Sequence, residues 1–208
     1  GVTDPYQYNV VFEVKDEDGA VVDREQDRIG FRFYCADPEE GFFLNGESYP
    51  LRGVNSHQDR YGKGYAATHQ DREQDMAMIA EMGANAIRFA HYQHDPLVYE
   101  LAAERGITVW AEIPMVNSIV NTREFYASTV NNLKELIHQA YNIPSVLMWG
   151  IHNEQWPNNT GITVLLDELY DTCKEEDPSR YVTVATAQEP SDDVSDAAWD
   201  PVALSWQS

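Results

Sequence analysis

The residues with the clearest capacity for chemistry are Asn153 and Glu154, which come one residue after the apolar run at residues 146–151. A run of this kind predicts a strand buried on both faces of a parallel sheet. In a (β/α) barrel, the carboxyl ends of such strands carry the chemistry. A carboxyl group buried there keeps its proton more readily than one in water, and can donate it to a leaving group. Glu154 is therefore a candidate general acid, although a Glu in this place is more often a helix N-terminal charge or a loop residue.

Polar side chains also follow the other predicted strands. Because the carboxyl ends of parallel strands meet at one edge of a sheet, we expect these side chains to surround the same site as Glu154. They are Asn55, His57, His91, Glu112 and Trp206.

Strand and helix patterns alternate from residue 51 onward. The predicted strands are 51–54, 86–90, 107–111, 146–151, 181–187 and 203–206. Helices are predicted after a capping box at Thr68 and Asp71 and after the Asp95-Pro96 start signal, and by apolar stripes at 129–140 and 162–173. This alternation predicts βαβ units and a parallel sheet. A doubly wound nucleotide-binding sheet would need a glycine-rich loop after its first strand, and residues 55–58 offer none.

The first 36 residues follow a different pattern. Alternating apolar residues at 8–14 predict a strand, Asp18-Gly19 predicts a hairpin turn, and a second strand is predicted at 20–32. Two strands alone are marginally stable, so we expect this hairpin to belong to a larger sheet. Residues 37–41 are interpreted as a linker that leads to a small hairpin at 42–49.

Acidic side chains strongly outnumber basic ones, with 35 Asp and Glu against 14 Lys and Arg and a net charge of −21. This balance argues against a nucleic-acid partner, whose phosphates require Lys and Arg, and against anionic membranes. No run of about 18 apolar residues is present, so no transmembrane helix is expected. Cys35 and Cys173 lack metal-ligand spacing, and Cys173 is predicted to be a buried thiol on an apolar helix face.

Two stretches of the sequence resemble signatures of glycoside hydrolase family 2, which contains β-galactosidases, β-glucuronidases and β-mannosidases. They are NIPSVLMWGIHNE at 142–154 and NAIRFAHY at 85–92, the latter followed by GITV at 106–109. The resemblance covers essentially the whole chain, with Gln93 where the family usually has Pro. It implies an α/β fold: a partial TIM (β/α)8 barrel, with about six of eight strands, at residues 37–208. It also implies that residues 1–36 are the last strands of an immunoglobulin-like β-sandwich.

The resemblance implies a retaining β-glycosidase that acts on a carbohydrate, with β-galactosidase as the expected activity. Retaining hydrolysis needs two carboxyl groups about 5–5.5 Å apart, one as acid/base and one as nucleophile. The resemblance assigns the acid/base to Glu154 and the nucleophile to a Glu at the end of a seventh strand, which this sequence lacks. We therefore expect the chain to be a piece of a larger enzyme and to be inactive alone.

The resemblance also places Arg88, His91 and Trp206 around the sugar, and Asn153 on the sugar 2-hydroxyl. His57 matches another site position. Because the family's Asn-Arg-His-Glu is Asn-Ser-His-Gln here, His57 remains either a site residue or a loop histidine.

Glu112 matches a family carboxylate near the acid/base, and its alternative role is that of a structural partner for Arg88. Some galactosidases of the family hold magnesium through Glu-Thr-His after the third strand, where this chain has Ile113-Pro114-Met115. We therefore expect no magnesium at that site and no other cofactor. His152 occupies a position that is commonly small in the family.

Two other functions remain open. A chain that naturally ended at residue 208 could be a non-catalytic carbohydrate-binding module. A barrel enzyme of another class, such as an aldolase or a metal hydrolase, is disfavoured because no strand-end Lys and no His-Glu-x-x-His motif is present. The open strand edges of a partial barrel leave room for a homo-oligomer.

Overall fold

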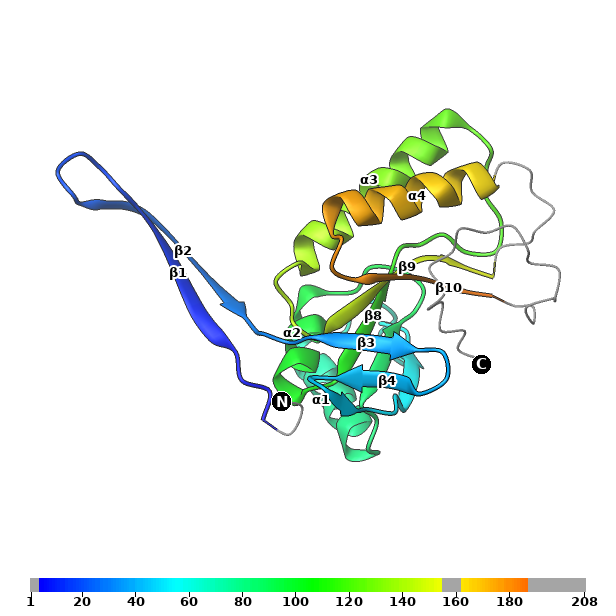
Figure 1. Ribbon diagram of the computed structural model, residues 1–208, viewed down its shortest axis with the longest axis horizontal. Helices are drawn as coiled ribbons and strands as arrows, with labels where there is room; N and C mark the ends of the chain where they lie inside the picture. Colours follow the sequence, from blue (N-terminus) through cyan, green and yellow to red (C-terminus); the bar gives the residue numbers. More distant parts are fainter. Residues whose placement is uncertain (1–3, 155–161, 187–208) are drawn as a thin grey trace.

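The computed structural model describes residues 4–154 and 162–186 (Figure 1). Five strands form one parallel sheet in the order β10-β9-β8-β7-β6. They are β6 (Gly53–Ser56), β7 (Ala86–Phe89), β8 (Thr108–Glu112), β9 (Val146–Asn153) and β10 (Tyr181–Ala185). The helices that connect them are α1 (His69–Glu81), α2 (Pro96–Arg105), α3 (Arg123–Ala140) and α4 (Ile162–Glu176). Each strand pairs with the next strand in sequence, so the described part is a partial barrel, as predicted. The sixth predicted strand lies outside the described residues.

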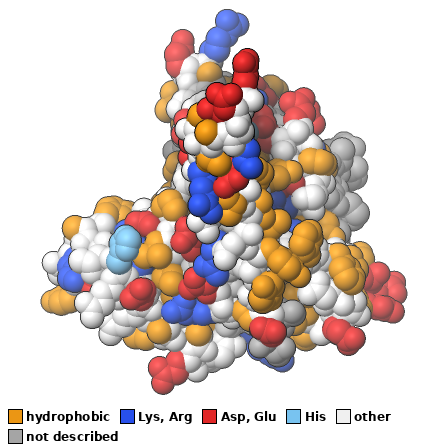
Figure 2. Space-filling view, turned by 90° about the vertical axis from the view of Figure 1, so that its left-hand side faces the viewer, with side chains coloured by type: hydrophobic (Ala, Val, Ile, Leu, Met, Phe, Trp, Pro, Cys, Tyr) orange, Lys and Arg blue, Asp and Glu red, His pale blue; other side chains and the backbone are white. Residues whose placement is uncertain are grey.

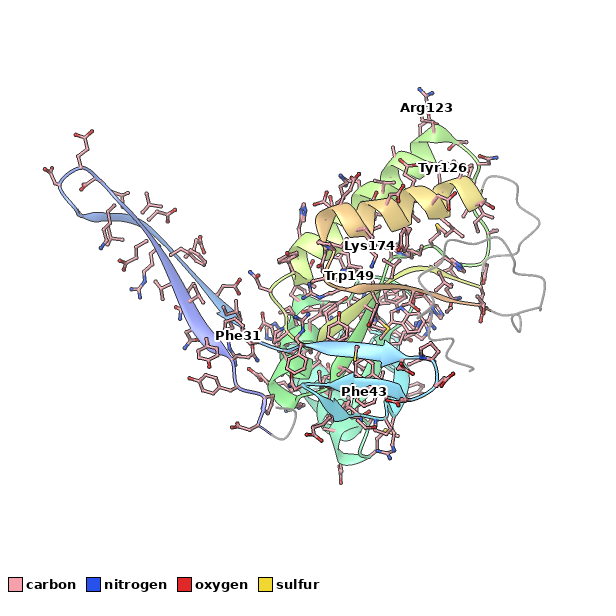
Figure 3. The ribbon with its side chains drawn as sticks, in the orientation of Figure 1. Phe31, Phe43, Arg123, Tyr126, Trp149 and Lys174 are labelled. Atoms are coloured by element: carbon pink, nitrogen blue, oxygen red, sulfur yellow. The ribbon has the colours of Figure 1, made fainter. Side chains whose placement is uncertain are left out.

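Local signals place the helices where the sequence predicted them. Thr68 and Asp71 form the capping box of α1, and Asp95 caps α2. Gly106 ends α2 in the left-handed conformation, with φ 67°. The buried face of α3 consists of the predicted apolar stripe. Together, α3 and α4 cover the outer face of β9, and Trp149 lies between the sheet and these helices (Figure 3).

The strand bounds differ from the prediction by one or two residues. β6 begins at Gly53, so Leu51 lies before it. The Arg52 amide donates to the side chain of Asn85 at 2.6 Å rather than to a backbone carbonyl of β7. β9 agrees with the prediction of a strand buried on both faces, since every residue of it is buried.

A small antiparallel sheet lies across the amino-terminal end of the barrel strands. Its strands are β3 (Tyr34–Asp37), β4 (Gly41–Leu44) and β5 (Glu47–Ser48). Phe42 and Leu44 pack with Leu147 and Met148 near the start of β9. The predicted linker at residues 37–41 was wrong, because these residues form a hairpin turn. The Asp37 side chain accepts hydrogen bonds from the Glu39 and Glu40 amides of that turn, and Asp37 pairs with Gly41.

The hairpin of β1 (Tyr8–Lys15) and β2 (Val21–Ile29) projects away from the barrel (Figure 1). Figure 2 looks along the hairpin and shows mixed charges on it, with hydrophobic side chains exposed around its base. Phe12 and Phe31 are 60% and 79% exposed. An ion pair of 2.7 Å between Arg28 and Glu104 tethers the hairpin to α2. Among the described residues, no helix has the length and apolar character needed to cross a membrane.

Candidate active site

Arg88 is the centre of a polar cluster at the carboxyl ends of β7, β8 and β9. Its Nε and Nη2 donate to the two carboxylate oxygens of Glu112, at 2.9 and 2.6 Å. Its Nη2 also lies 2.7 Å from Asn153 Oδ1 and 3.1 Å from His91 Nδ1. The structure therefore brings together four of the residues that the sequence singled out, from three neighbouring strands.

Trp110 and Gly150 shape the floor of this cluster. The guanidinium of Arg88 lies 4.8 Å from the centre of the Trp110 ring, a cation–π contact. A Cβ at Gly150 would lie 2.7 Å from Glu112 Oε2 and would also collide with the Trp110 indole. Glycine is therefore required at position 150 for Trp110 and Glu112 to occupy their places. The sequence analysis missed both residues, although Trp110 lies two residues before Glu112 and thus on the same face of its strand.

Glu112 is completely buried, and burial raises its pKa. The hydrogen bonds and charge of Arg88, together with the Trp110 indole, lower that pKa and offset part of the effect. Both carboxylate oxygens are engaged by one guanidinium, which is the strongest geometry for such a pair. This arrangement favours the structural interpretation of Glu112 over that of a free reactive carboxylate.

Burial, Arg88 and His57 lower the pKa of His91, while the charge of Glu154 acts in the opposite direction. Its imidazole is therefore neutral near pH 7. A guanidinium can only donate, so its contact with Nδ1 of His91 favours the tautomer with the ring proton on Nε2. The cluster thus holds His91 in position and favours one tautomer.

Glu154 is the first residue after β9. Its backbone turns sharply, with φ 52°, and its amide donates to Ala185 O of β10 at 2.8 Å. The side chain is exposed in the described structure, so the expected burial of this carboxyl group is wrong. The cause is the left-handed backbone at Glu154, which turns its side chain away from the strand. Asn153, one residue earlier, is still in the strand and is only 2% exposed.

His152, which the sequence analysis left without a role, is buried between Ile151 and Asn153 along β9. Burial and the nearby charge of Arg88 lower its pKa to about 4. Its Nδ1 has no hydrogen-bond partner among the described residues.

A second group of rings extends the cluster outward. His57 is exposed and its ring centre lies 4.9 Å from that of His91. The Nδ1 of His57 is 3.1 Å from the Tyr92 hydroxyl. His57 is therefore adjacent to the cluster, and Tyr92 is a neighbour that the sequence analysis missed. Trp206 lies outside the described residues.

The arrangement combines a guanidinium paired with a buried carboxylate, a neutral imidazole, a fixed amide and an exposed carboxyl group. Such groups can bind hydroxyl groups and exchange a proton with a bound molecule. In residues 4–154 and 162–186, no three His, Cys, Asp or Glu side chains gather in a way that could hold a metal ion.

Known proteins resemble this chain in sequence and in fold. The TIM barrel domain of glycosyl hydrolases family 2 matches residues 37–205. A β-glucuronidase of Bacteroides fragilis is 40% identical over 196 residues, which are 91% of this chain and 28% of that protein. A β-galactosidase of Psychromonas ingrahamii is 31% identical over 186 residues, 86% of this chain and 17% of that protein. The crystal structure of an FMN-binding β-glucuronidase from Faecalibacterium prausnitzii L2-6 matches 89% of this chain and 29% of that one, with 40% identity and a TM-score of 0.86. The chain thus spans less than a third of the length of these relatives.

Proposed function

The chain belongs to glycosyl hydrolase family 2, and we propose that the whole protein is a retaining β-glycosidase with Glu154 as its general acid/base. The observation that supports this role is the position of Glu154 at the carboxyl end of β9, directly after Asn153 of the Arg88 cluster. Of the two carboxyl groups at the ends of β8 and β9, Glu154 is exposed, whereas Glu112 is buried. A proton donor must reach the leaving oxygen of a bound substrate.

In the proposed reaction, Glu154 donates its proton to the glycosidic oxygen while a second carboxylate attacks the anomeric carbon. The aglycone leaves, and a covalent glycosyl-enzyme remains. Glu154 then removes a proton from water, which attacks the anomeric carbon and releases the sugar and the second carboxylate. Glu112 does not suit the role of nucleophile because Arg88 occupies both of its oxygens. We therefore assign the nucleophile to a part of the protein outside this chain.

Asn153 and His91 are proposed to bind the sugar. Asn153 Oδ1 accepts from Arg88, which leaves the Nδ2 amino group as the donor for a sugar hydroxyl. His91 is held by the same guanidinium, which favours the tautomer with the ring proton on Nε2, so it too offers a donor. Arg88 acts through these two residues as a positioning group.

The sugar is proposed to be a β-glucuronide, with a β-galactoside as the second candidate. The sequence analysis expected a galactoside, and the comparisons do not confirm that choice. The two relatives at 40% identity are named β-glucuronidases, whereas the β-galactosidase of P. ingrahamii is 31% identical. Both classes of glycoside therefore belong in the first assay.

We also propose that residues 1–36 belong to an immunoglobulin-like sandwich, with residues 37–208 in the barrel domain. The β1–β2 hairpin leaves large apolar side chains such as Phe12 and Val14 exposed, at 60% and 57%. An isolated two-stranded hairpin is marginally stable, so further strands of a sandwich would cover these side chains.

The test of the acid/base assignment is Glu154→Gln in the whole protein. We expect kcat/KM to fall by about 10²–10⁴-fold for an alkyl glycoside, whose leaving group needs a proton. A dinitrophenyl glycoside of the same sugar leaves as a stable phenolate, so its glycosylation step should change far less. Glu81→Gln at the exposed end of α1 is the matched control. Equal losses on both substrates, with glycosylation rate-limiting, would contradict the assignment.

A further inference from the structure

The segment between β6 and α1, residues 57–68, presents two tyrosine rings to solvent. Tyr61 is completely exposed, and Tyr65 is 66% exposed. Both belong to a tight turn in which Arg60 and Gly64 exchange backbone hydrogen bonds of 3.0 and 2.8 Å. Gly62, in the middle of the turn, has φ 76°, a conformation that glycine adopts without strain. Isolated exposed rings are common on protein surfaces, so exposure alone assigns no role.

What distinguishes this turn is the way it is fixed to α1. Arg60 donates to the Asp71 carbonyl oxygen at 2.9 Å, to Gln74 Oε1 at 2.6 Å and to Asp75 Oδ1 at 3.2 Å. Lys63 Nζ lies 2.6 Å from Asp71 Oδ2. The Lys63 hydrogen bond, together with the bonds from Thr68, holds the pKa of Asp71 well below its usual range, so the carboxylate of this clamp stays charged. The two rings are therefore carried by a braced turn rather than by a free loop.

The turn is also continuous with the candidate active site. The ring of Tyr65 makes an edge contact with that of Tyr92, with 6.1 Å between centres and 77° between planes. Tyr92 is joined to His57 by the 3.1 Å hydroxyl contact, and His57 packs on His91. A chain of ring contacts thus runs from the Arg88 cluster to Tyr65 at the surface.

From this geometry, and on the basis of the proposed glycosidase function, we infer that Tyr65 and Tyr61 form the subsite for the leaving group of the substrate. The leaving group must extend away from the sugar on the side of the acid/base, and the ring path provides a surface that begins at His91. The two cations of the turn, Arg60 and Lys63, are engaged by α1, so the surface offers aromatic faces rather than free charge. Apart from the two phenol hydroxyls, such a surface offers ring faces for stacking, and we assign it a planar, uncharged aromatic aglycone.

The experiment compares phenyl and methyl glycosides of the sugar that the whole wild-type protein hydrolyses. Stacking on one ring is worth about a 3- to 10-fold difference in kcat/KM. We therefore expect Tyr65→Ala to lower the phenyl-to-methyl ratio of kcat/KM by about that factor, chiefly through KM of the phenyl glycoside. Tyr65→Phe, which keeps the ring, should retain most of the ratio. Tyr61→Ala should lower it less, because Tyr61 lies farther along the turn.

Met78→Ala, on the exposed face of α1, is the control and should leave the ratio unchanged, since this side chain is 50% exposed and outside the ring path. An unchanged ratio in Tyr65→Ala, in a protein that hydrolyses glycosides, would overturn the subsite. A larger loss on a disaccharide than on the phenyl glycoside would overturn its aromatic specificity. If the wild-type protein hydrolyses no glycoside, the proposed function itself fails, and this outcome is separate from the others.

Discussion

Removing either partner of the Arg88–Glu112 pair should destabilise the barrel, and removing both should cost far less than the sum. Glu112 is completely buried and the Arg88 side chain is 10% exposed. Glu112→Gln leaves a buried guanidinium with only neutral acceptors, and Arg88→Met leaves a buried carboxyl group without a cation. Breaking a buried pair in this way typically costs about 3–5 kcal/mol.

The cost of Arg88→Met should be at the lower end, about 3 kcal/mol, because a carboxyl group that has lost its partner can take up a proton. In the double variant no buried charge remains, so we expect a total near 3 kcal/mol, against about 6–8 kcal/mol for the sum of the two single losses. The coupling energy is then about 3–5 kcal/mol.

The stability of the Arg88→Met variant should also depend on pH. Burial raises the pKa of Glu112 above 4.5, and Arg88 lowers it. Without Arg88 the pKa rises further, so the folded state binds a proton that the unfolded state has released. The stability of Arg88→Met should therefore fall as the pH rises from 4.5 through this elevated pKa, and it should be higher at pH 5 than at pH 8.

The measurement is urea denaturation of the whole protein, monitored by tryptophan fluorescence. It compares the two single variants and the double variant at pH 5 and at pH 8. Losses that add to within about 0.5 kcal/mol would refute the idea that the two side chains stabilise each other. A loss in Arg88→Met that does not change with pH would refute the proposed protonation of Glu112.

Two further predictions concern the residues that support the site. Gly150→Ala places a methyl group 2.7 Å from Glu112 Oε2. Thermal unfolding should therefore show that the free energy of unfolding falls by about 1–3 kcal/mol, and kcat/KM should fall as well. If neither value changed, this packing would be contradicted. Burial lowers the pKa of His94 to about 4, against 6.5 in the unfolded chain. The free energy of unfolding should therefore fall by up to about 3 kcal/mol as the pH drops from about 6.5 to about 4. His152 contributes a similar slope, so His94→Phe should remove about half of it. An unchanged slope in urea denaturation from pH 7 to pH 4 would contradict that assignment.

The elements that the sequence predicted well are those fixed by local interactions. The cap at Thr68 and the Pro96 start depend on residues three or fewer positions apart. The buried stripe of α3 repeats with the helical period, so one face could be read directly. The strand at β9 followed from its apolar composition, because only a strand covered on both sides can bury every residue.

The features that the sequence did not predict depend on contacts between strands. Nothing near Gly150 in the sequence indicates that Trp110 and Glu112 fill the space beside it, because the pairing that brings Glu112 opposite Gly150 is set by the sheet register. Tyr92 was missed for the same reason, since its hydroxyl contacts His57 from another strand end. The exposure of Glu154 depends on one left-handed residue, which composition does not reveal.

The described strands contain a complete positioning network, although they form only part of a barrel. Arg88 contacts Glu112 of β8, Asn153 of β9 and His91 at the end of β7, through its Nε and Nη2. Because all three contacts are made by described residues, the donors proposed to bind the sugar are held in place by this part of the protein. Sites that are held in this way lose little order when substrate binds. In the reaction proposed above, the remaining part of the protein would supply the attacking carboxylate at the correct distance from Glu154, while the described strands organise the sugar site.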